Sequence, residues 1–226
     1  PGKQETMGII PITAGSNHKL TFEIAKTIKR KAAGVNGVAA NIMGLTNVRY
    51  GKRSRSVLTF GTTPDFDRVR QLYTQIGRFI TDRDIERNNR VCVIGVTLKR
   101  ELFGDEPALY KRVLVNGSKH MVVGILEERG MALGIDLGDI CIIPLPSSQD
   151  LFHRKELFEI LCSARTQEDI KRASKSVRAI MMNAFDNNED FTITDQNGML
   201  GAFTRIFDML RLMLAGIASI SLLVGG

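Results

Sequence analysis

The stretch TFEIAKTIKRKAAGVNGVAANI, residues 21–42, predicts a helix followed by a strand. Thr21 is a suitable N-cap, and Gly34 is a suitable residue to end the helix. One face of this helix carries Ile24, Ile28 and Ala32. The strand that follows has apolar residues at Val35, Val38, Ala40 and Ile42. Residues 21–42 are therefore expected to form one αβ unit.

A similar unit lies near the other end of the chain. A strand is predicted over residues 158–163, and Thr166 can cap the helix after it, with Glu168 and Asp169 in the first turn. The apolar face of that helix carries Ile170, Ala173, Val177, Ile180 and Ala184. Residues 191–193 then form a strand. If the two units pack together, both ends of the chain build one α+β domain and the middle is an insertion.

The middle of the chain has a different pattern, with short β-rich runs and two short helices, at 65–76 and 97–102. Asn116-Gly117 lies between two strand-like segments, 111–115 and 119–125, and predicts a hairpin with a type I′ turn. The strand 140–143 should end at the prolines that follow it. We therefore predict an α+β subdomain from residues 1–60 and 150–197, an inserted β-rich subdomain at 61–149, and a separate segment at 198–226.

The last segment is apolar. No charged residue follows Arg211, and residues 212–226 cover roughly 22 Å as a helix, less than the ~30 Å core of a bilayer. Apolar residues at helical spacing continue upstream to about residue 196. We expect a stalk helix that enters a truncated transmembrane segment, with Phe203, Phe207, Leu210, Leu214, Ile217 and Leu222 facing the membrane or the stalk contact. The alternative is a buried C-terminal helix of a soluble domain.

The overall composition gives no sign of a nucleic-acid surface. The formal charge is +7, but basic and acidic residues are interleaved, Trp is absent, and no basic stripe with aromatic residues occurs. We therefore expect no nucleic-acid partner. Cys92, Cys141 and Cys162 lie in apolar runs and are predicted to be small buried side chains. The chain begins Pro1-Gly2 without a signal-peptide pattern, so we expect it to be part of a longer protein.

Catalytic signatures are also missing from the sequence. It has no phosphate-binding loop of the G-x-x-x-x-G-K-[ST] type and no G-x-S-x-G elbow, and its three histidines lack metal-ligand spacing. Acid pairs such as Asp65/Asp67 and Asp82/Asp84 occur where helices begin and are predicted to cap them. We expect no catalytic residue, cofactor or metal. The glycines Gly130, Gly134 and Gly138 predict a loop that is a candidate partner surface.

Several strings, in this order, resemble the MacB-like periplasmic core domain of FtsX/MacB-type ABC transporter permeases. The first are Leu20-Thr21 to Ile28 with Ala33-Gly34-Val35, then Phe60-Gly61-x-x-Pro64-Asp65-Phe66, and Gly77-Arg78-Phe79-Ile80 followed by Asp84. Next come Val93-Ile94-Gly95 with Glu101-Leu102-Phe103-Gly104, Val115-x-Gly117 with Val122-Val123-Gly124, and Ile142-Ile143-Pro144-Leu145. Finally, residues 217–226 are similar to the start of the second transmembrane helix of the family.

The resemblance implies a Porter-like α+β half, formed by both chain ends, interrupted by a β-rich, Sabre-like half. It further implies a domain that is held between two helices of the bacterial cytoplasmic (inner) membrane and faces the periplasm or the outside. The implied partners are an ABC ATPase subunit or domain, a periplasmic adaptor protein and a second permease, as a homodimer or heterodimer. The implied function is to couple ATPase motion to substrate export.

Two alternatives remain open at this stage. A lipoprotein-releasing permease would share the architecture but hold a lipid-modified client, and a soluble ligand-binding protein or enzyme would bury the C-terminal helix. One local departure concerns residues 108–112, Ala-Leu-Tyr-Lys-Arg, where the family usually has Gly-Lys before the hairpin strand. The loop there, and any adaptor contact inferred for it, are therefore not carried over.

Overall fold

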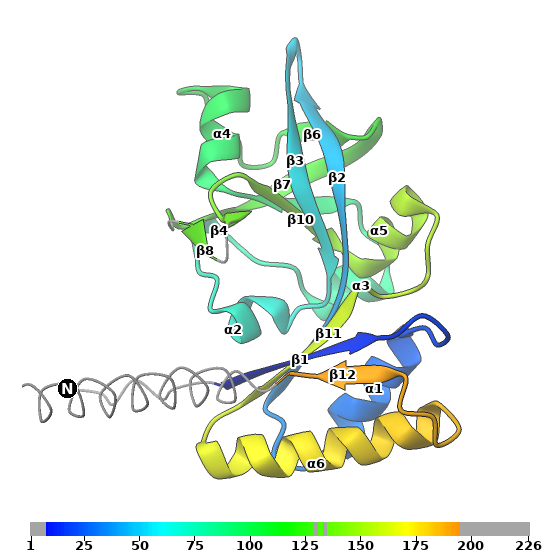
Figure 1. The fold of residues 1–226 in the computed structure, drawn as a ribbon. Helices are drawn as coiled ribbons and strands as arrows, with labels where there is room; N and C mark the ends of the chain where they lie inside the picture. Colours follow the sequence, from blue (N-terminus) through cyan, green and yellow to red (C-terminus); the bar gives the residue numbers. More distant parts are fainter. Residues whose placement is uncertain (1–7, 129–130, 133–134, 195–226) are drawn as a thin grey trace, which may run out of the picture. The chain divides into compact units, whose positions relative to one another are not determined.

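The computed structural model describes residues 8–128, 131–132 and 135–194. They form an α+β fold in which helices flank one long sheet (Figure 1). The helices are α1 (Phe22–Lys31), α2 (Phe66–Arg70), α3 (Asp82–Glu86), α4 (Val96–Phe103), α5 (Leu145–Phe152) and α6 (Gln167–Ala184). The strands are β1 (Gly8–Ala14), β2 (Gly37–Tyr50), β3 (Arg53–Thr62), β4 (Thr74–Gly77), β5 (Val91–Ile94), β6 (Arg112–Val115), β7 (Ser118–Leu126), β8 (Met131–Ala132), β9 (Ile135–Asp136), β10 (Ile140–Pro144), β11 (Glu159–Ala164) and β12 (Phe191–Ile193).

The main sheet has the strand order β12-β1-β11-β2-β3-β10-β5-β7-β4, and β6 pairs with both β2 and β7. Most pairs are antiparallel, whereas β10 runs parallel to β3 and β5 runs parallel to β7. Strands β8 and β9 form a separate two-stranded sheet. Segments from both ends of the chain are therefore neighbours at one end of the sheet, and the middle of the chain builds the other end.

The two predicted αβ units are confirmed. The Thr21 hydroxyl accepts a hydrogen bond from the Ile24 amide at 3.4 Å, and the Thr166 hydroxyl accepts one from the Asp169 amide at 3.1 Å. Helices α1 and α6 lie together on one face of strands β1, β11 and β2 (Figure 1). The buried face of α6 includes Met181, which the sequence analysis missed, whereas Ala184 is exposed.

Strand β2 is much longer than the sequence predicted. The expected strand ended at Ile42, but β2 continues to Tyr50, turns through Gly51 and Lys52, and returns as β3 in ten antiparallel residue pairs. Gly51 has φ +57°, a conformation that glycine adopts at little cost. This hairpin extends away from the layer of α1 and α6 (Figure 1).

Two further cores cover the rest of the sheet. One packs α2 against one face through Phe66 and Val69, and the other packs α4 against the opposite face through Leu98 and Leu102. The side chains of β5 and β10 alternate between these cores, as expected for strands buried on both sides. Cys92, Cys141 and Cys162 are free and buried, so their prediction as small buried side chains is confirmed.

The helix predicted over residues 65–76 is wrong in its length. Helix α2 ends at Arg70 because Gln71 takes a left-handed conformation with φ +54°, and the chain then forms β4. Phe66, Val69 and Leu72 are all buried, so the three-residue spacing of the apolar side chains was consistent with a longer helix. The predicted hairpin turn is confirmed, because Asn116 and Gly117 have φ values of +45° and +83°.

The two predicted subdomains share secondary structure elements. Strand β3 runs through the predicted boundary at residue 60, and α5 runs through the boundary at residue 149. Residues up to Ile193 form one compact unit, and the segment from Thr194 is a second unit. The exact boundaries of a Porter-like and a Sabre-like half therefore stay a prediction.

Gly61 of β3 provides a test of the close contact between α5 and the sheet. A Cβ atom at Gly61 would lie 1.8 Å from Ser148 Oγ and 2.0 Å from Ser148 Cβ. We expect Gly61→Ala to lower the free energy of unfolding by about 2–3 kcal/mol through overpacking. Ser148→Gly removes both clashing atoms, so the Gly61→Ala/Ser148→Gly double variant should be more stable than additivity predicts. Urea unfolding of the four proteins measures this coupling, and strict additivity would contradict the proposed close contact.

Candidate functional site

A buried carboxylate, Asp65, connects the N-terminal αβ unit to helix α2 in the middle of the chain. It lies at the start of α2, and its Oδ2 atom is 2.9 Å from the Lys29 ammonium of α1 and accepts a hydrogen bond from the Val38 amide of β2 at 3.2 Å. Its Oδ1 atom accepts a hydrogen bond from Arg68 at 2.7 Å. Burial alone would raise the pKa of Asp65, but these hydrogen bonds and charges outweigh it and hold the pKa below its ordinary value.

A second polar contact lies beside the first. Glu159 of β11 accepts hydrogen bonds from the Asn41 side-chain amide of β2 at 3.2 Å and from the Arg70 guanidinium of α2 at 3.1 Å. The Thr62 hydroxyl of β3 donates to the Asn41 side-chain carbonyl. These hydrogen bonds join four elements, β11, β2, α2 and β3, and they satisfy polar groups that the fold buries. We call the residues around Asp65 and Glu159 the polar junction, comprising Lys29, Asn41, Thr62, Asp65, Arg68, Arg70 and Glu159.

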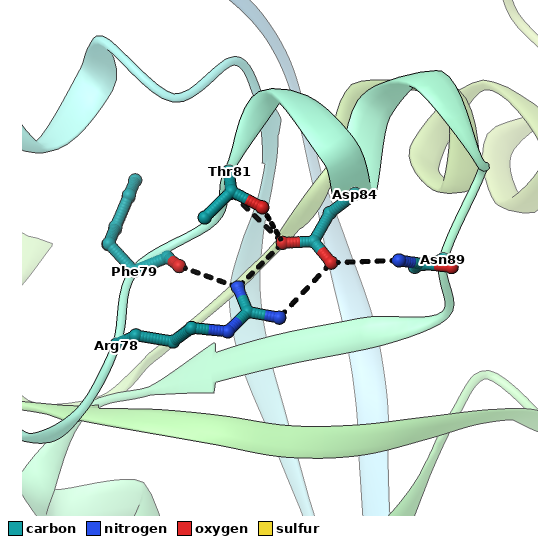
Figure 2. Close-up of polar contacts among 5 residues, drawn as sticks. All are labelled: Arg78, Phe79, Thr81, Asp84 and Asn89. Carbon is teal, nitrogen blue, oxygen red and sulfur yellow. Dashed lines mark hydrogen bonds and ion pairs between the residues drawn. The ribbon is translucent and has the colours of Figure 1, made fainter.

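The third polar cluster holds the loop between β4 and β5 (Figure 2). The Arg78 guanidinium binds the Asp84 carboxylate through two hydrogen bonds, at 2.6 and 3.2 Å, and also donates to the Phe79 carbonyl. Thr81 donates to Asp84 from its amide and its hydroxyl, forming a capping box at the start of α3. The Asn89 side chain, three residues after the end of α3, donates to Asp84 at 3.0 Å. Asp84 is only 1% exposed. Without these hydrogen bonds the turn would bury an unpaired negative charge, so the bonds are needed to stabilise it.

The pKa of Asp84 is strongly shifted. Burial alone would raise it, but the hydrogen bonds from Arg78, Asn89 and Thr81 outweigh burial and hold the pKa far below its ordinary value. The carboxylate is therefore charged at neutral pH and serves as an acceptor. This pattern is typical of a structural ion pair, whereas a general acid needs a raised pKa.

The residues that the sequence analysis proposed for partner and membrane contacts are only partly described. Phe203, Phe207, Leu210, Leu214, Ile217 and Leu222, together with Gly130 and Gly134, lie outside the described residues. Gly138 is buried, and its carbonyl accepts hydrogen bonds from the Thr97 and Leu98 amides at the start of α4. Gly138 thus caps α4 from the end of the loop, and the partner role of this loop stays a prediction.

Asp65, Asp67, Asp82 and Asp84 lie where helices begin, as predicted, and Asp84 completes the capping box of α3. The predicted capping role is wrong for Asp65, whose carboxylate makes no cap on α2 because it is bonded to Lys29, Val38 and Arg68. Among the described residues, no three His, Cys, Asp or Glu side chains gather in a way that could hold a metal ion. Within the same residues, no helix is both long and apolar enough to cross a bilayer.

The sequence analysis missed the polar junction. A usable signal was present, because Asn41 interrupts the apolar run 38–42 and Glu159 interrupts the apolar run 157–162. A polar residue in the middle of a buried strand needs a partner. Which partner it has depends on strand pairing, and the sequence did not provide that.

The sequence pattern of the MacB-like periplasmic core domain matches residues 2–180. The chain belongs to this family. Its curated relatives include the macrolide export ATP-binding/permease protein MacB of Chlorobium luteolum, 31% identical over 87% of this chain and 31% of that protein. Another is the pyoverdine export ATP-binding/permease protein PvdT of Pseudomonas syringae, 30% identical over 81% of this chain and 28% of that protein. The chain thus spans about a third of the length of these relatives.

Solved structures show the same fold. The periplasmic region of MacB from Actinobacillus actinomycetemcomitans superimposes with a TM-score of 0.74 and 18% identity, covering 87% of this chain and 92% of that one. The extracellular domain of the noncanonical ABC-type transporter YknZ from Gram-positive bacteria gives 0.71 and 20% identity, covering 83% of this chain and 100% of that one. The predicted α+β fold and the resemblance to the MacB-like family are therefore confirmed.

The Asp84 cluster predicts a large difference between two neighbouring carboxylates. Asp84→Ala leaves the Thr81 amide and the Asn89 side chain without their acceptor and should lower the free energy of unfolding by about 2–4 kcal/mol. Asp82→Ala removes an exposed carboxylate from the first turn of the same helix and should cost less than about 1 kcal/mol. Urea unfolding at pH 7 compares them, and equal losses would contradict the assigned role.

The depressed pKa of Asp84 also predicts how its contribution changes with pH. The unfolded pKa is about 3.9, so the stabilisation is fully present above that pH and is lost as the pH falls toward the lower folded pKa. The difference in unfolding free energy between wild type and Asp84→Ala should therefore be constant from pH 5 to 7. Below about pH 4 it should shrink by about 1.4 kcal/mol per pH unit. A difference that stays constant down to pH 2.5 would be inconsistent with this carboxylate as the cause.

Proposed function

We propose that this chain is the extracytoplasmic domain of an ABC transporter permease and that it couples the motion of a cytoplasmic ATPase to substrate export. The observation that carries the proposal is the family match, together with relatives that are named as export ATP-binding/permease proteins. These names support export as the function, in preference to release of lipoproteins. The parent protein lies in the bacterial cytoplasmic membrane, and the domain faces the periplasm or the outside.

The way the chain enters and leaves the fold supports a domain held between two membrane helices. Strands β1 and β12 are antiparallel neighbours, with Ile12 opposite Ile193 and Ala14 opposite Phe191. The first described strand and the last one are therefore adjacent at one edge of the sheet. A membrane helix before β1 and another after β12 would act on this same edge. We further propose that residues 198–226 form the stalk and the start of the second of these helices.

The polar junction gives this edge a stiff connection to the rest of the domain. Lys29 and Glu159 belong to elements near the membrane-linked edge, whereas Asp65 and Arg70 belong to α2. Asp65 and Glu159 are nearly buried. A bend between α2 and the membrane-linked edge would pull these carboxylates away from their cationic partners where little water can replace them, and this is costly. Motion applied at β1 and β12 is thus passed on as movement of a rigid body.

The partners follow from the same proposal. The parent permease binds an ABC ATPase subunit or domain, pairs with a second permease as a homodimer or heterodimer, and engages a periplasmic adaptor protein. The loop that contains Gly130, Gly134 and Gly138 lies between β7 and β10, in the half that is remote in sequence from both chain ends. We assign this loop to the adaptor contact.

The coupling proposal is tested with Asp65 in the full-length permease. Asp65→Ala removes the contacts to α1 and β2, and we expect ATP hydrolysis to be retained while export, measured as macrolide resistance of cells, falls at least fivefold. The matched control is Asp67→Asn, two residues further along on α2, whose carboxylate accepts a hydrogen bond from the Arg68 backbone amide and bonds neither α1 nor β2 in the described part of the chain. The control should keep both activities. Normal export in Asp65→Ala would contradict the role of the polar junction, and absence of any ATP-dependent activity in the wild-type complex would contradict the permease assignment.

A further inference from the structure

Four cationic side chains from separate segments surround an open hollow of about 450 Å³. Arg78 follows β4, Arg90 directly precedes β5, Arg112 lies on β6 and Lys119 lies on β7. None of these residues belongs to the polar junction. The hollow lies beside the Asp84 cluster, so part of its wall is held in place by the capped turn of α3 (Figure 2).

The charges around the hollow are unbalanced. The single carboxylate that lines it is Asp84, whose two oxygens already accept hydrogen bonds from Arg78, Thr81 and Asn89. Four cations and one carboxylate leave a formal charge of +3. His120 also lines the hollow but adds no charge at neutral pH, because burial lowers the pKa of its imidazole.

Strand register places two of the cations side by side. Arg112 lies opposite Met121, and Leu114 lies opposite Lys119, in the antiparallel pair of β6 and β7. Paired residues share a face and residues two apart share a face, so Arg112 and Lys119 are on the same face of the hairpin. Both side chains are on exposed residues, and neither forms an ion pair within the described part of the chain.

Two arginines elsewhere in the domain, Arg55 of β3 and Arg70 of α2, are paired with carboxylates. Arg55 is bonded to Asp139 at 2.8 Å and Arg70 to Glu159 at 3.1 Å. In the hollow, by contrast, Arg90 makes only a long hydrogen bond of 3.4 Å to the Ser118 hydroxyl. Four cations beside a single carboxylate repel one another, and a bound anion reduces that repulsion.

We propose that this hollow binds a phosphate group, with Arg90, Arg112 and Lys119 as its direct ligands and Arg78 as a fixed cation at its edge. A phosphate dianion offsets two of these three net positive charges, and a guanidinium group can bind two phosphate oxygens at once. The hollow is larger than one phosphate ion, so it has room for the group that carries the phosphate. That carrier is either a soluble phosphate ester or the headgroup of a phospholipid.

The test measures binding of inorganic phosphate to the 226-residue chain by NMR titration or calorimetry, with chloride replacing phosphate at constant ionic strength as the baseline. We expect saturable binding, weakened about tenfold or more by Arg112→Gln/Lys119→Gln, since each charge-assisted hydrogen bond is worth about 1.5 kcal/mol or more. The matched control, Lys171→Gln/Lys175→Gln, removes the same charge from the exposed face of α6 and should bind as wild type.

Two further arms distinguish the source of the phosphate. Glycerol phosphate represents a soluble ester, and vesicles with phosphatidic acid, compared with phosphatidylcholine alone, represent a lipid headgroup. One of these two probes, the one that resembles the natural ligand, should bind more tightly than inorganic phosphate. Its affinity should fall in Arg112→Gln/Lys119→Gln. Equal losses in this variant and in the α6 control, or no saturable binding of any of the three probes, would overturn the proposal. Neither result depends on transport, so the permease assignment is tested separately.

Discussion

Strand β2 is paired with three different strands along its length, and the rest of the domain depends on this arrangement. Its first residues pair with β11, its central and last residues pair with β3, and Val48 and Arg49 also pair with β6. A single strand thus belongs both to the layer that α1 and α6 cover and to the part of the sheet that the middle of the chain builds. Separating the two parts at this point would leave buried backbone N–H and C=O groups of β2 unpaired, which costs free energy.

The side chains at this crossing reinforce the backbone. Asp65 is bonded to α1 and to β2, and Glu159 bonds Asn41 and Arg70 from the neighbouring strand β11. Surface ion pairs add little to stability, but these carboxylates are nearly buried, and their loss would leave donors without acceptors. Such a junction resists bending, which suits a domain whose proposed task is to pass on motion. The cationic hollow shares no residue with this junction, so the proposed phosphate binding and the stiffness of the junction depend on different side chains.

The structure also gives a physical reason for two of the sequence strings that this chain shares with the MacB-like periplasmic core domain family. Gly61 in the Phe60-Gly61-x-x-Pro64 string is required because α5 approaches β3 so closely that a Cβ would meet Ser148. Arg78 and Asp84, six residues apart, form the ion pair that closes the turn before α3. One is a packing constraint and the other an ion pair, and both act within the fold of this domain.

The sequence by itself determined the local elements. Thr21 and Thr166 cap their helices, Asn116-Gly117 makes the hairpin turn, and the apolar spacing in both αβ units follows from contacts within a few residues. Only the tertiary structure decided the length of β2, the end of α2 at Gln71 and the partners of Asn41, Glu159 and Arg112. The physical reason is that strand pairing joins residues far apart in the chain, so buried polar groups and exposed cations find or lack their partners only once the sheet has formed.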